Sequence, residues 1–261
     1  MAVAAFFDVD NTIMRGASIY HLARGLFAKG ILTAADLASY AVAQGKFLTV
    51  SSESQRDLAR ISSNALAFAK GRTRDEMDAL CEEIFDEVMA DKVWPGTVEL
   101  AHAHKASGHQ VWLVSAAPIE LATIIANRLG LDGAIATVSE IVDGRYTGRL
   151  AGSPMHGPAK AQAVRELAER SGIALSDCFA YSDSENDIPL LTEVGHPVVV
   201  NPDSALRQYA RARNWPLYDF RRDHIKERYA KPATVTAVAA VLGAGVGVAM
   251  AISKSKKGAR E

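Results

Sequence analysis

Short apolar runs alternate along the chain with longer stretches whose apolar residues recur at helical spacing. Each run is four to six residues long and is followed by polar or turn-forming residues, which is typical of buried strands. We expect strands at 4–7, 111–114, 178–181, 197–202 and 215–220, and helices at 97–107, 119–129 and from 158 onward. Because helices that connect successive strands favour parallel pairing, the pattern predicts an α/β fold built on a parallel sheet.

Two segments depart from this alternation. Between the first and second apolar runs, helical spacing recurs without any intervening strand, at 18–28, 33–47, 53–69 and 73–89. Thr73 and Glu76 have the spacing of a capping box, which would start the last of these helices. Further along, Asp143-Gly144 separates the strand-like stretches 136–141 and 146–150. The sequence therefore predicts a helical insertion after the first strand and a later β-hairpin beside the sheet.

Composition excludes several classes of protein. The 261 residues carry 29 basic and 30 acidic side chains and are 49% hydrophobic, so the chain can bury a large core and has no overall basic character for binding nucleic acid. Cys81 and Cys178 are the only cysteines, which excludes a disulfide framework and a cysteine metal cluster. The N-terminus enters a predicted strand without the basic start of a signal peptide. We therefore expect a cytoplasmic catalytic part.

Side chains suited to phosphoryl transfer follow the predicted strands. Asp8 and Asp10 come directly after the first strand, and Ser115 follows the second. Lys160 stands at the start of a helical pattern, and the acidic segment 182–187 follows the next strand. Because the carboxyl ends of parallel strands share one edge of the sheet, we expect these groups to meet there. Several carboxylates in one pocket need positive charge to stay ionised, which Lys160 and a metal ion would supply.

With these groups in this order, residues 3–220 resemble the haloacid dehalogenase superfamily, in particular its phosphoserine-phosphatase-like subclass IB. The family motifs match at Asp8-Val9-Asp10-Asn11-Thr12, Ser115, Lys160 and Asp183 with Asn186-Asp187. The second aspartate of the first motif, Asp10, favours a phosphatase over a dehalogenase. The resemblance implies an α/β fold in which helices flank a Rossmann-like parallel sheet, with a helical cap inserted after the first strand.

The resemblance also implies a role for each of these residues. Asp8 would be the nucleophile that forms an aspartyl-phosphate, and Asp10 would protonate the leaving alcohol and later activate water. Ser115, Lys160 and Asn186 would bind the substrate phosphate. The metal ion would be Mg²⁺, held by oxygen ligands. The ligands would be the Asp8 carboxylate, the Asp10 backbone carbonyl, Asp183, and Asp187 acting through water.

The same resemblance divides the chain into three parts. The catalytic core would comprise residues 1–15 and 92–220, and the helical cap residues 16–91. Such a cap closes over the phosphate and contacts the rest of the substrate. The alternative is a plain helical subdomain without a gating role. Residues 221–261 would form a basic linker, an apolar helix and a basic tail.

Two departures from the phosphoserine phosphatase pattern bear on the substrate. Those enzymes carry a glutamate nine positions after the nucleophile that meets the substrate's amino group, whereas this chain has Ala17 there. Neighbouring Arg15 is better suited to an anionic group or a second phosphate. Ser115 is followed by Ala116-Ala117 in place of glycines, which narrows the floor of the pocket. We therefore predict a phosphomonoester other than phosphoserine.

The segment 233–252 has 20 residues without a charge, enough to span a membrane as a helix. It is rich in alanine and valine, so its insertion would be marginal, and Gly243 and Gly247 could let two helices approach closely. Basic residues flank both of its ends and fix no orientation. We predict that it attaches the enzyme to the inner face of the cell membrane. A shallow helix, a helix docked on the protein and a disordered tail are the alternatives.

The remaining conspicuous residues are interpreted as structural. His102 and His104 are two positions apart on a predicted helix, too far round it to share a ligand, and we expect both at the surface. His156 lies near Lys160 in a loop and is interpreted as incidental. The tryptophans are expected to pack in the core or at the cap hinge. None of them adds a functional site.

The sequence therefore predicts a Mg²⁺-dependent phosphomonoesterase that acts on a small-molecule or lipid phosphate and binds no nucleic acid. One alternative is a membrane-tethered phosphate-binding or scaffold protein without significant turnover. The complete set of Asp8, Asp10, Lys160 and Asp183 weighs against that alternative. Transfer of the phosphoryl group to an acceptor other than water is the third possibility.

Overall fold

The computed structural model describes residues 2–38 and 67–221, and the described residues up to Phe220 form one compact unit. The predicted apolar helix at 233–252 lies outside the described residues, as do most of the predicted helices at 33–47 and 53–69. Within the described ranges, no helix is both long enough and apolar enough to cross a membrane.

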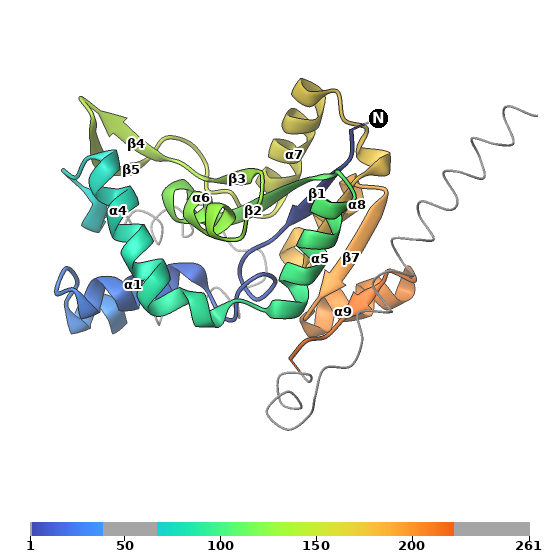
Figure 1. Cartoon of the computed structure of the whole chain (residues 1–261), viewed down its shortest axis with the longest axis horizontal. Coiled ribbons are helices and arrows are strands. Elements are labelled where there is room, and N and C mark those ends of the chain that lie inside the picture. The colour runs from blue at the N-terminus through green and yellow to red at the C-terminus, as the bar shows by residue number, and fades with distance from the viewer. Residues whose placement is uncertain (1, 39–66, 222–261) are drawn as a thin grey trace, which may run out of the picture. The chain divides into compact units, whose positions relative to one another are not determined.

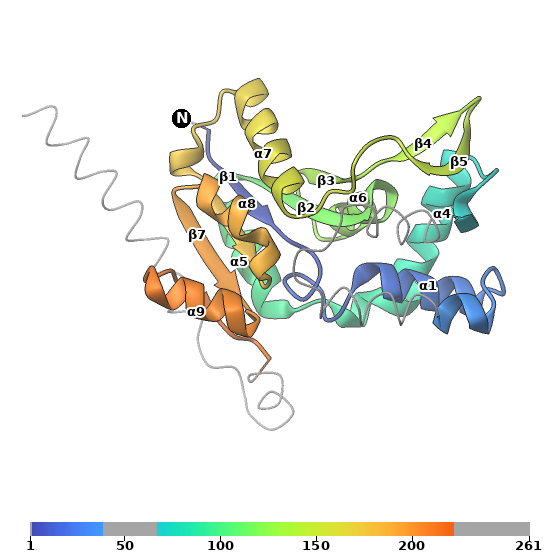
Figure 2. The same cartoon turned by 180° about the vertical axis from the view of Figure 1, so that it is seen from behind.

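The centre of the fold is a six-stranded parallel sheet with the strand order β3-β2-β1-β6-β7-β8 (Figures 1 and 2). Its first strand is central, because β1 pairs with β2 on one side and β6 on the other. The strands are β1 Ala4–Phe7, β2 Gln110–Pro118, β3 Gly133–Thr137, β6 Phe179–Ser182, β7 His196–Val200 and β8 Leu217–Tyr218. The predicted parallel sheet is therefore confirmed.

Helices connect these strands and cover both faces of the sheet. They are α5 Pro95–Ala106, α6 Ile119–Arg128, α7 Pro158–Ser171, α8 Ile188–Glu193 and α9 Ser204–Ala212. Local sequence sets their ends. In α7, Pro158 stands in the first turn, where its missing N–H costs nothing, and Gly172 ends the helix with a φ of 64°.

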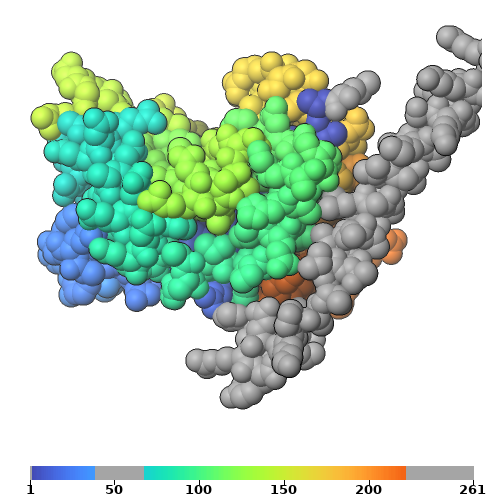
Figure 3. Space-filling view, viewed as in Figure 1, coloured from blue at the N-terminus to red at the C-terminus, as the bar shows by residue number. Residues whose placement is uncertain are grey.

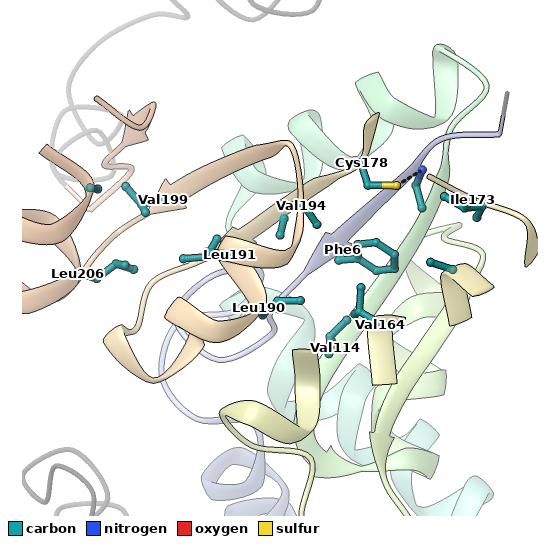
Figure 4. Close-up of a cluster of buried hydrophobic side chains, with 14 residues drawn as sticks. Phe6, Val114, Val164, Ile173, Cys178, Leu190, Leu191, Val194, Val199 and Leu206 are labelled. Atoms are coloured by element: carbon teal, nitrogen blue, oxygen red, sulfur yellow. Dashed lines mark hydrogen bonds between the residues drawn. The ribbon is translucent and has the colours of Figure 1, made fainter. Parts of the chain in front are cut away.

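One face of the sheet packs into a continuous apolar core (Figure 4). Phe6 of β1 lies near its centre, and Val114 of β2 and Leu190 of α8 belong to the same cluster. Val164 contributes from α7, and Leu206 continues the cluster at the α9 end. Because side chains alternate along a strand, Phe6 and its neighbour Phe7 point to opposite faces. The helices on the Phe6 face therefore enclose β1 from that side.

On the opposite face of the sheet, His104 is buried among aromatic side chains instead of lying at the surface. Phe7 stacks on Tyr181 with ring centroids 4.1 Å apart, and His104 of α5 lies edge-on to both rings. His104 is fully buried, and its Nε2 bonds the Tyr181 hydroxyl at 2.7 Å. Its Nδ1 lies 2.8 Å from Nδ1 of His109. The prediction that His104 lies at the surface was therefore wrong, whereas His102 is exposed as expected.

We expect the burial of His104 to make the protein less stable in acid. Burial, with smaller contributions from His109 and His196, lowers the pKa of His104 to about 3. Below pH 6.5 the unfolded chain therefore binds a proton at this histidine, whereas the folded chain does not. The free energy of unfolding therefore decreases as the pH is lowered. Between pH 6.5 and pH 5 the titration of His104 alone should lower the free energy of unfolding by about 2 kcal/mol.

Urea unfolding at the two pH values tests this expectation. His104→Gln keeps a polar partner for Tyr181 but cannot become charged, so it should lose about 2 kcal/mol less on acidification than the wild type. His102→Gln, at the exposed position on the same helix, should behave like the wild type. An equal acid loss in His104→Gln and wild type would contradict the expectation.

The described part of the helical insertion begins with α1 Ser18–Ala28, as predicted. After the undescribed stretch, a 3₁₀ turn at Ala67–Ala69 leads to α4 Arg74–Ile84, whose predicted capping box between Thr73 and Glu76 is confirmed. The predicted helix 73–89 is not one regular α-helix. It changes to π-helical geometry at Phe85–Met89 and ends in a 3₁₀ turn at Ala90–Lys92.

The insertion is fastened to the core on its α4 side. Arg128 at the end of α6 forms a two-pronged ion pair with Asp86, with distances of 3.0 and 2.8 Å from Nε and Nη2 to the two carboxylate oxygens. Arg128 also lies 3.6 Å from Glu82. In Figure 3 the teal surface of this segment is continuous with the green surface of the core.

The predicted hairpin is present, but its first strand starts later than expected. Residues 136–141 do not form one strand, because the stretch ends β3 in the main sheet and then begins β4 Ser139–Val142. β4 pairs antiparallel with β5 Arg145–Leu150 in a separate two-stranded sheet. The turn end of this hairpin contacts the insertion, since the Gly71 N–H donates to Tyr146 O and the Tyr146 N–H donates to Arg72 O.

Candidate active site

The carboxyl ends of β1, β2 and β6 bring the predicted site residues together. Asp8 directly follows β1, and its N–H donates to the carbonyl of Tyr181 on β6 at 2.9 Å. Ser115 lies within β2, which continues to Pro118 instead of ending at 114. The pairing of β2 with β3 shifts register between Ser115 and Pro118. Such an irregularity re-aims side chains, and here it occurs at the predicted phosphate-binding serine.

Lys160 joins two of the predicted carboxylates. It lies in the first turn of α7, and its Nζ contacts Asp8 Oδ1 at 2.5 Å and Asp187 Oδ2 at 2.8 Å. All three side chains are buried. Ser182 at the end of β6 donates from its hydroxyl to the same Asp187 oxygen at 2.8 Å. The site therefore has a buried ion-pair network that links β1, α7 and the loop after β6.

The electrostatics of this network favour a further cation. Burial raises the pKa of Asp8 to about 7, opposed by Lys160 and reinforced by Asp187 and Asp10. Burial also raises the pKa of Asp10, and it raises that of Asp183 well above the usual range. Burial alone would lower the pKa of Lys160, but Asp187 and Asp8 raise it overall. A single lysine thus balances four neighbouring carboxylates, an arrangement that suits a divalent cation.

The residues present can supply oxygen ligands to such a cation. Asp8 and Asp183 offer carboxylates from two adjacent loops, and the Thr12 hydroxyl lies 3.5 Å from Asp183 Oδ1. Among the described residues, no three His, Cys, Asp or Glu side chains are grouped to hold a metal ion by themselves. Mg²⁺ does not need such a group, because it usually keeps several waters and takes one or two carboxylates. The donor set therefore fits Mg²⁺.

Asp10 lies at the start of the insertion. Its Oδ1 accepts hydrogen bonds from the backbone N–H of Ser18 at 2.9 Å and from the Ser18 hydroxyl at 2.6 Å. Ser18 is the first residue of α1, so the carboxylate occupies the positive end of the helix dipole. The orientation of Asp10 is thereby tied to the first helix of the insertion.

Two other predicted residues have their own local partners. The Ser115 side chain is buried, and its Oγ accepts the Ala117 N–H at 3.1 Å, which leaves the hydroxyl proton for another acceptor. Asn186 is half-buried, and its side-chain amide donates to Ser184 Oγ at 3.3 Å. The structure therefore directs the Asn186 amide at its own loop, whereas Ser115 is buried within the last part of β2.

Sequence reasoning missed the hydroxyl groups of Ser18 and Ser182, which hold Asp10 and Asp187. Ser182 stood within the acidic segment already singled out, and its place at the strand exit was the available signal. Ser18 had no comparable signal, because its contact with Asp10 arises only when the chain turns back between them.

Arg15 has partners in the linker between core and insertion. Its Nε donates to Lys92 O at 3.4 Å, its Nη2 contacts Asp91 O, and its guanidinium lies over the Trp94 ring at 5.6 Å from the centroid. The Arg15 N–H also donates to Lys92 O at 2.7 Å. These contacts join the two chain segments that enter and leave the insertion. Trp94 therefore packs beside the segments that enter and leave the insertion.

Comparison with known proteins places this site in a family. The family model for haloacid dehalogenase-like hydrolases matches residues 5–192. A phosphoserine phosphatase, SerB1 of Mycobacterium tuberculosis strain H37Rv, is 48% identical over 257 residues, which cover 98% of this chain and 82% of that protein. A histidinol-phosphatase of Neisseria meningitidis serogroup C is 29% identical over 221 residues, covering 83% and 98% of the two chains.

A solved structure has the same fold. The crystal structure of a protein of unknown function from Bordetella pertussis Tohama I matches with a TM-score of 0.72 at 30% identity. The match covers 84% of this chain and 99% of that chain. The match therefore extends over most of both chains.

Proposed function

This chain belongs to the haloacid dehalogenase-like hydrolase family and is a phosphatase of its phosphoserine-phosphatase-like type, and on that premise we propose that it hydrolyses phosphomonoesters through a phosphoryl group carried by Asp8. The observation that carries this proposal is the buried contact of Asp8 with Lys160, at the edge of the sheet where three strands end. Lys160 holds one oxygen of the Asp8 carboxylate and leaves the other for attack. A scaffold protein without turnover would have no need of this arrangement.

In the first step the free Asp8 oxygen attacks phosphorus, and the bond from phosphorus to the ester oxygen breaks. Asp10 donates its proton to the departing alcohol. In the second step Asp10 takes a proton from water as that water attacks phosphorus, and the bond from Asp8 to phosphorus breaks. The raised pKa of Asp10 suits a carboxyl group that must be protonated at the start of the cycle.

Lys160 and Ser115 would bind the phosphoryl oxygens, since catalysis of this reaction depends on positioning and on compensating negative charge. Mg²⁺ would supply further positive charge at the same oxygens when bound. The Asp8 carboxylate, the Asp10 carbonyl and Asp183 would hold it, with Asp187 acting through water. The predicted role of Asn186 in substrate binding requires its amide to leave Ser184.

The substrate we propose is a small phosphomonoester. The names of two relatives refer to the phosphate esters of serine and of histidinol. Both of these esters carry an ammonium group. Ala17 stands where phosphoserine phosphatases carry a glutamate, and it is 5% exposed at the start of α1, so it offers no charge to an ammonium group. The guanidinium of Arg15 is already engaged by the linker carbonyls, which weakens the case for a second anionic group.

Phosphate release from a panel of substrates tests the function. The panel contains phosphoserine, histidinol phosphate, a sugar phosphate and lysophosphatidate, each with Mg²⁺ and with excess EDTA. We expect Mg²⁺-dependent turnover of at least one small substrate and none in EDTA. A lipid preference that is lost when the chain ends at residue 230 would support the predicted membrane attachment through 233–252. Failure of every substrate would contradict the enzyme assignment.

We expect Ser18→Ala to change the pH dependence of turnover. The Ser18 hydroxyl lowers the pKa of Asp10, so its loss should raise that pKa further and move the limb of the pH profile that reports Asp10 to higher pH. With one of the two donors gone, we expect kcat to fall about tenfold, the cost of about one charge-assisted hydrogen bond. Ser18→Thr keeps the hydroxyl and is the control. Identical pH profiles for all three proteins would refute this role.

A further inference from the structure

We propose that Asn201 and Asp203, in the loop after β7, form a brace that sets the distance between the two catalytic loops and so determines the affinity for the divalent cation. This inference rests on the proposed function, because it concerns the same metal site. Neither residue belongs to the catalytic motifs, and neither would contact substrate. Both are positioning residues that act on the backbone of other loops.

Asn201 holds the loop that follows β1. Its Nδ2 donates to the carbonyl of Asn11 at 3.0 Å, and its Oδ1 accepts the Phe220 N–H at 2.8 Å. The backbone N–H of Asn201 donates to Tyr218 O at 2.8 Å. The side chain is 2% exposed and the residue has a φ of 49°, a conformation that asparagine adopts more readily than most residues. The side chain is thus fixed on both sides.

Asp203 holds the loop that follows β6. Its N–H donates to the carbonyl of Asp183 at 2.8 Å, and its Oδ2 accepts the N–H of Glu185 at 2.9 Å. Its other oxygen caps α9 by accepting the Leu206 N–H at 2.7 Å. The backbone N–H of Asp203 thus holds Asp183, and its carboxylate ties Glu185 to the start of a regular helix.

The two arms join on one short segment. Pro202 stands between Asn201 and Asp203, and its ring fixes φ at that position, which restricts the motion of one arm relative to the other. The loops they hold carry the proposed ligands, with Asp8 and Asp10 in one and Asp183 in the other. The side-chain contact between these loops from Thr12 to Asp183 is long, at 3.5 Å.

This arrangement bears on Mg²⁺ because that ion requires nearly ideal octahedral geometry. Small changes in the separation of its ligands are therefore costly. Loss of outer contacts that orient metal ligands typically reduces metal affinity about 10–100-fold. We expect the brace to act on metal affinity more strongly than on folding, because its contacts lie in loops outside the apolar core.

The test measures Mg²⁺ binding to the full chain by calorimetry, without substrate. Asn201→Gly accommodates the positive φ and deletes both side-chain bonds. Asp203→Asn keeps one oxygen that can cap α9 but loses the oxygen that accepts the backbone N–H of Glu185. Asn214→Gly is the matched control, because Asn214 also has a positive φ, of 56°, in the turn between α9 and β8. Thermal unfolding of each protein in EDTA reports the fold.

We expect Asn201→Gly to weaken Mg²⁺ binding about tenfold or more and Asp203→Asn to weaken it severalfold. Asn214→Gly should bind as the wild type does. Unchanged affinity in both brace variants would overturn the proposal, as would an equal loss in Asn214→Gly. A loss of affinity that merely follows a lower unfolding temperature in EDTA would also overturn it. Phosphate release by the wild type tests the proposed function separately.

Discussion

Asp8→Asn should abolish phosphate release while leaving the protein folded. The carboxamide has nearly the same shape as the carboxylate but cannot attack phosphorus, so we expect turnover to fall at least about 10³-fold. The fold should tolerate the change, because Lys160 keeps its contact with Asp187. Burial already disfavours the charged form of Asp8, as its raised pKa shows, so the neutral side chain should unfold at the same or a higher temperature.

Two measurements separate this outcome from general damage. Phosphate release is compared across wild type, Asp8→Asn and Asp177→Asn, the last of which makes the same change at an exposed position. Mass spectrometry after acid quenching of a reaction mixture should detect a phosphorylated wild-type chain and an unmodified Asp8→Asn chain. Substantial turnover by Asp8→Asn would assign the nucleophile to another residue and would contradict the proposed mechanism.

Lys160→Met should reduce both stability and activity. The Lys160 side chain is 4% exposed and contacts Asp8 and Asp187, so its removal leaves two buried carboxylates without their cation. Breaking a buried pair from one side typically costs about 3–5 kcal/mol, and we expect a loss of this size in the free energy of unfolding measured without Mg²⁺. Activity should also fall strongly, because the phosphoryl group loses a compensating charge.

The sign of the pH dependence distinguishes this mechanism from a simple packing defect. Without Lys160 the folded-state pKa of Asp8 rises further, so Asp8 takes up a proton before the unfolded chain does as pH falls. The stability gap between wild type and Lys160→Met should therefore narrow from pH 8 to pH 5 in urea unfolding. Adding Asp187→Asn to Lys160→Met should recover part of the loss at pH 8. A gap that is constant with pH would indicate lost packing instead.

The elements that sequence reasoning predicted well are those with local causes. The first strand was readable from four consecutive apolar residues, and the start of α4 from the spacing of Thr73 and Glu76. Both depend on residues close in the chain. The meeting of Asp8 with Lys160 was anticipated because the edge at which parallel strands end is fixed by topology. The contact of Lys160 with both Asp8 and Asp187 required the structure.

Features with distant causes were not predicted. His104 is buried because Tyr181, far along the chain, brings a hydroxyl to its ring, and helical spacing alone carries no sign of that partner. The division of 136–141 into the end of β3 and the start of β4 depends on β2 and β5 as neighbours. The brace formed by Asn201 likewise depends on the carbonyl of Asn11, to which no residue near Asn201 in the sequence points.

The central position of β1 has a consequence for the order in which the protein is made. Residues 4–7 are synthesised before both of their partners, because Ala5 pairs with Val111 on one side and Phe179 on the other. The nascent chain therefore carries an apolar strand that lacks at least one of its two partners until β6 has been synthesised. Pairings so distant in sequence form slowly, and an exposed strand of this kind invites association between chains. The nucleophile loop thus waits for its neighbours until β6 has been made, and a chaperone that shields β1 until then should raise the yield of active enzyme.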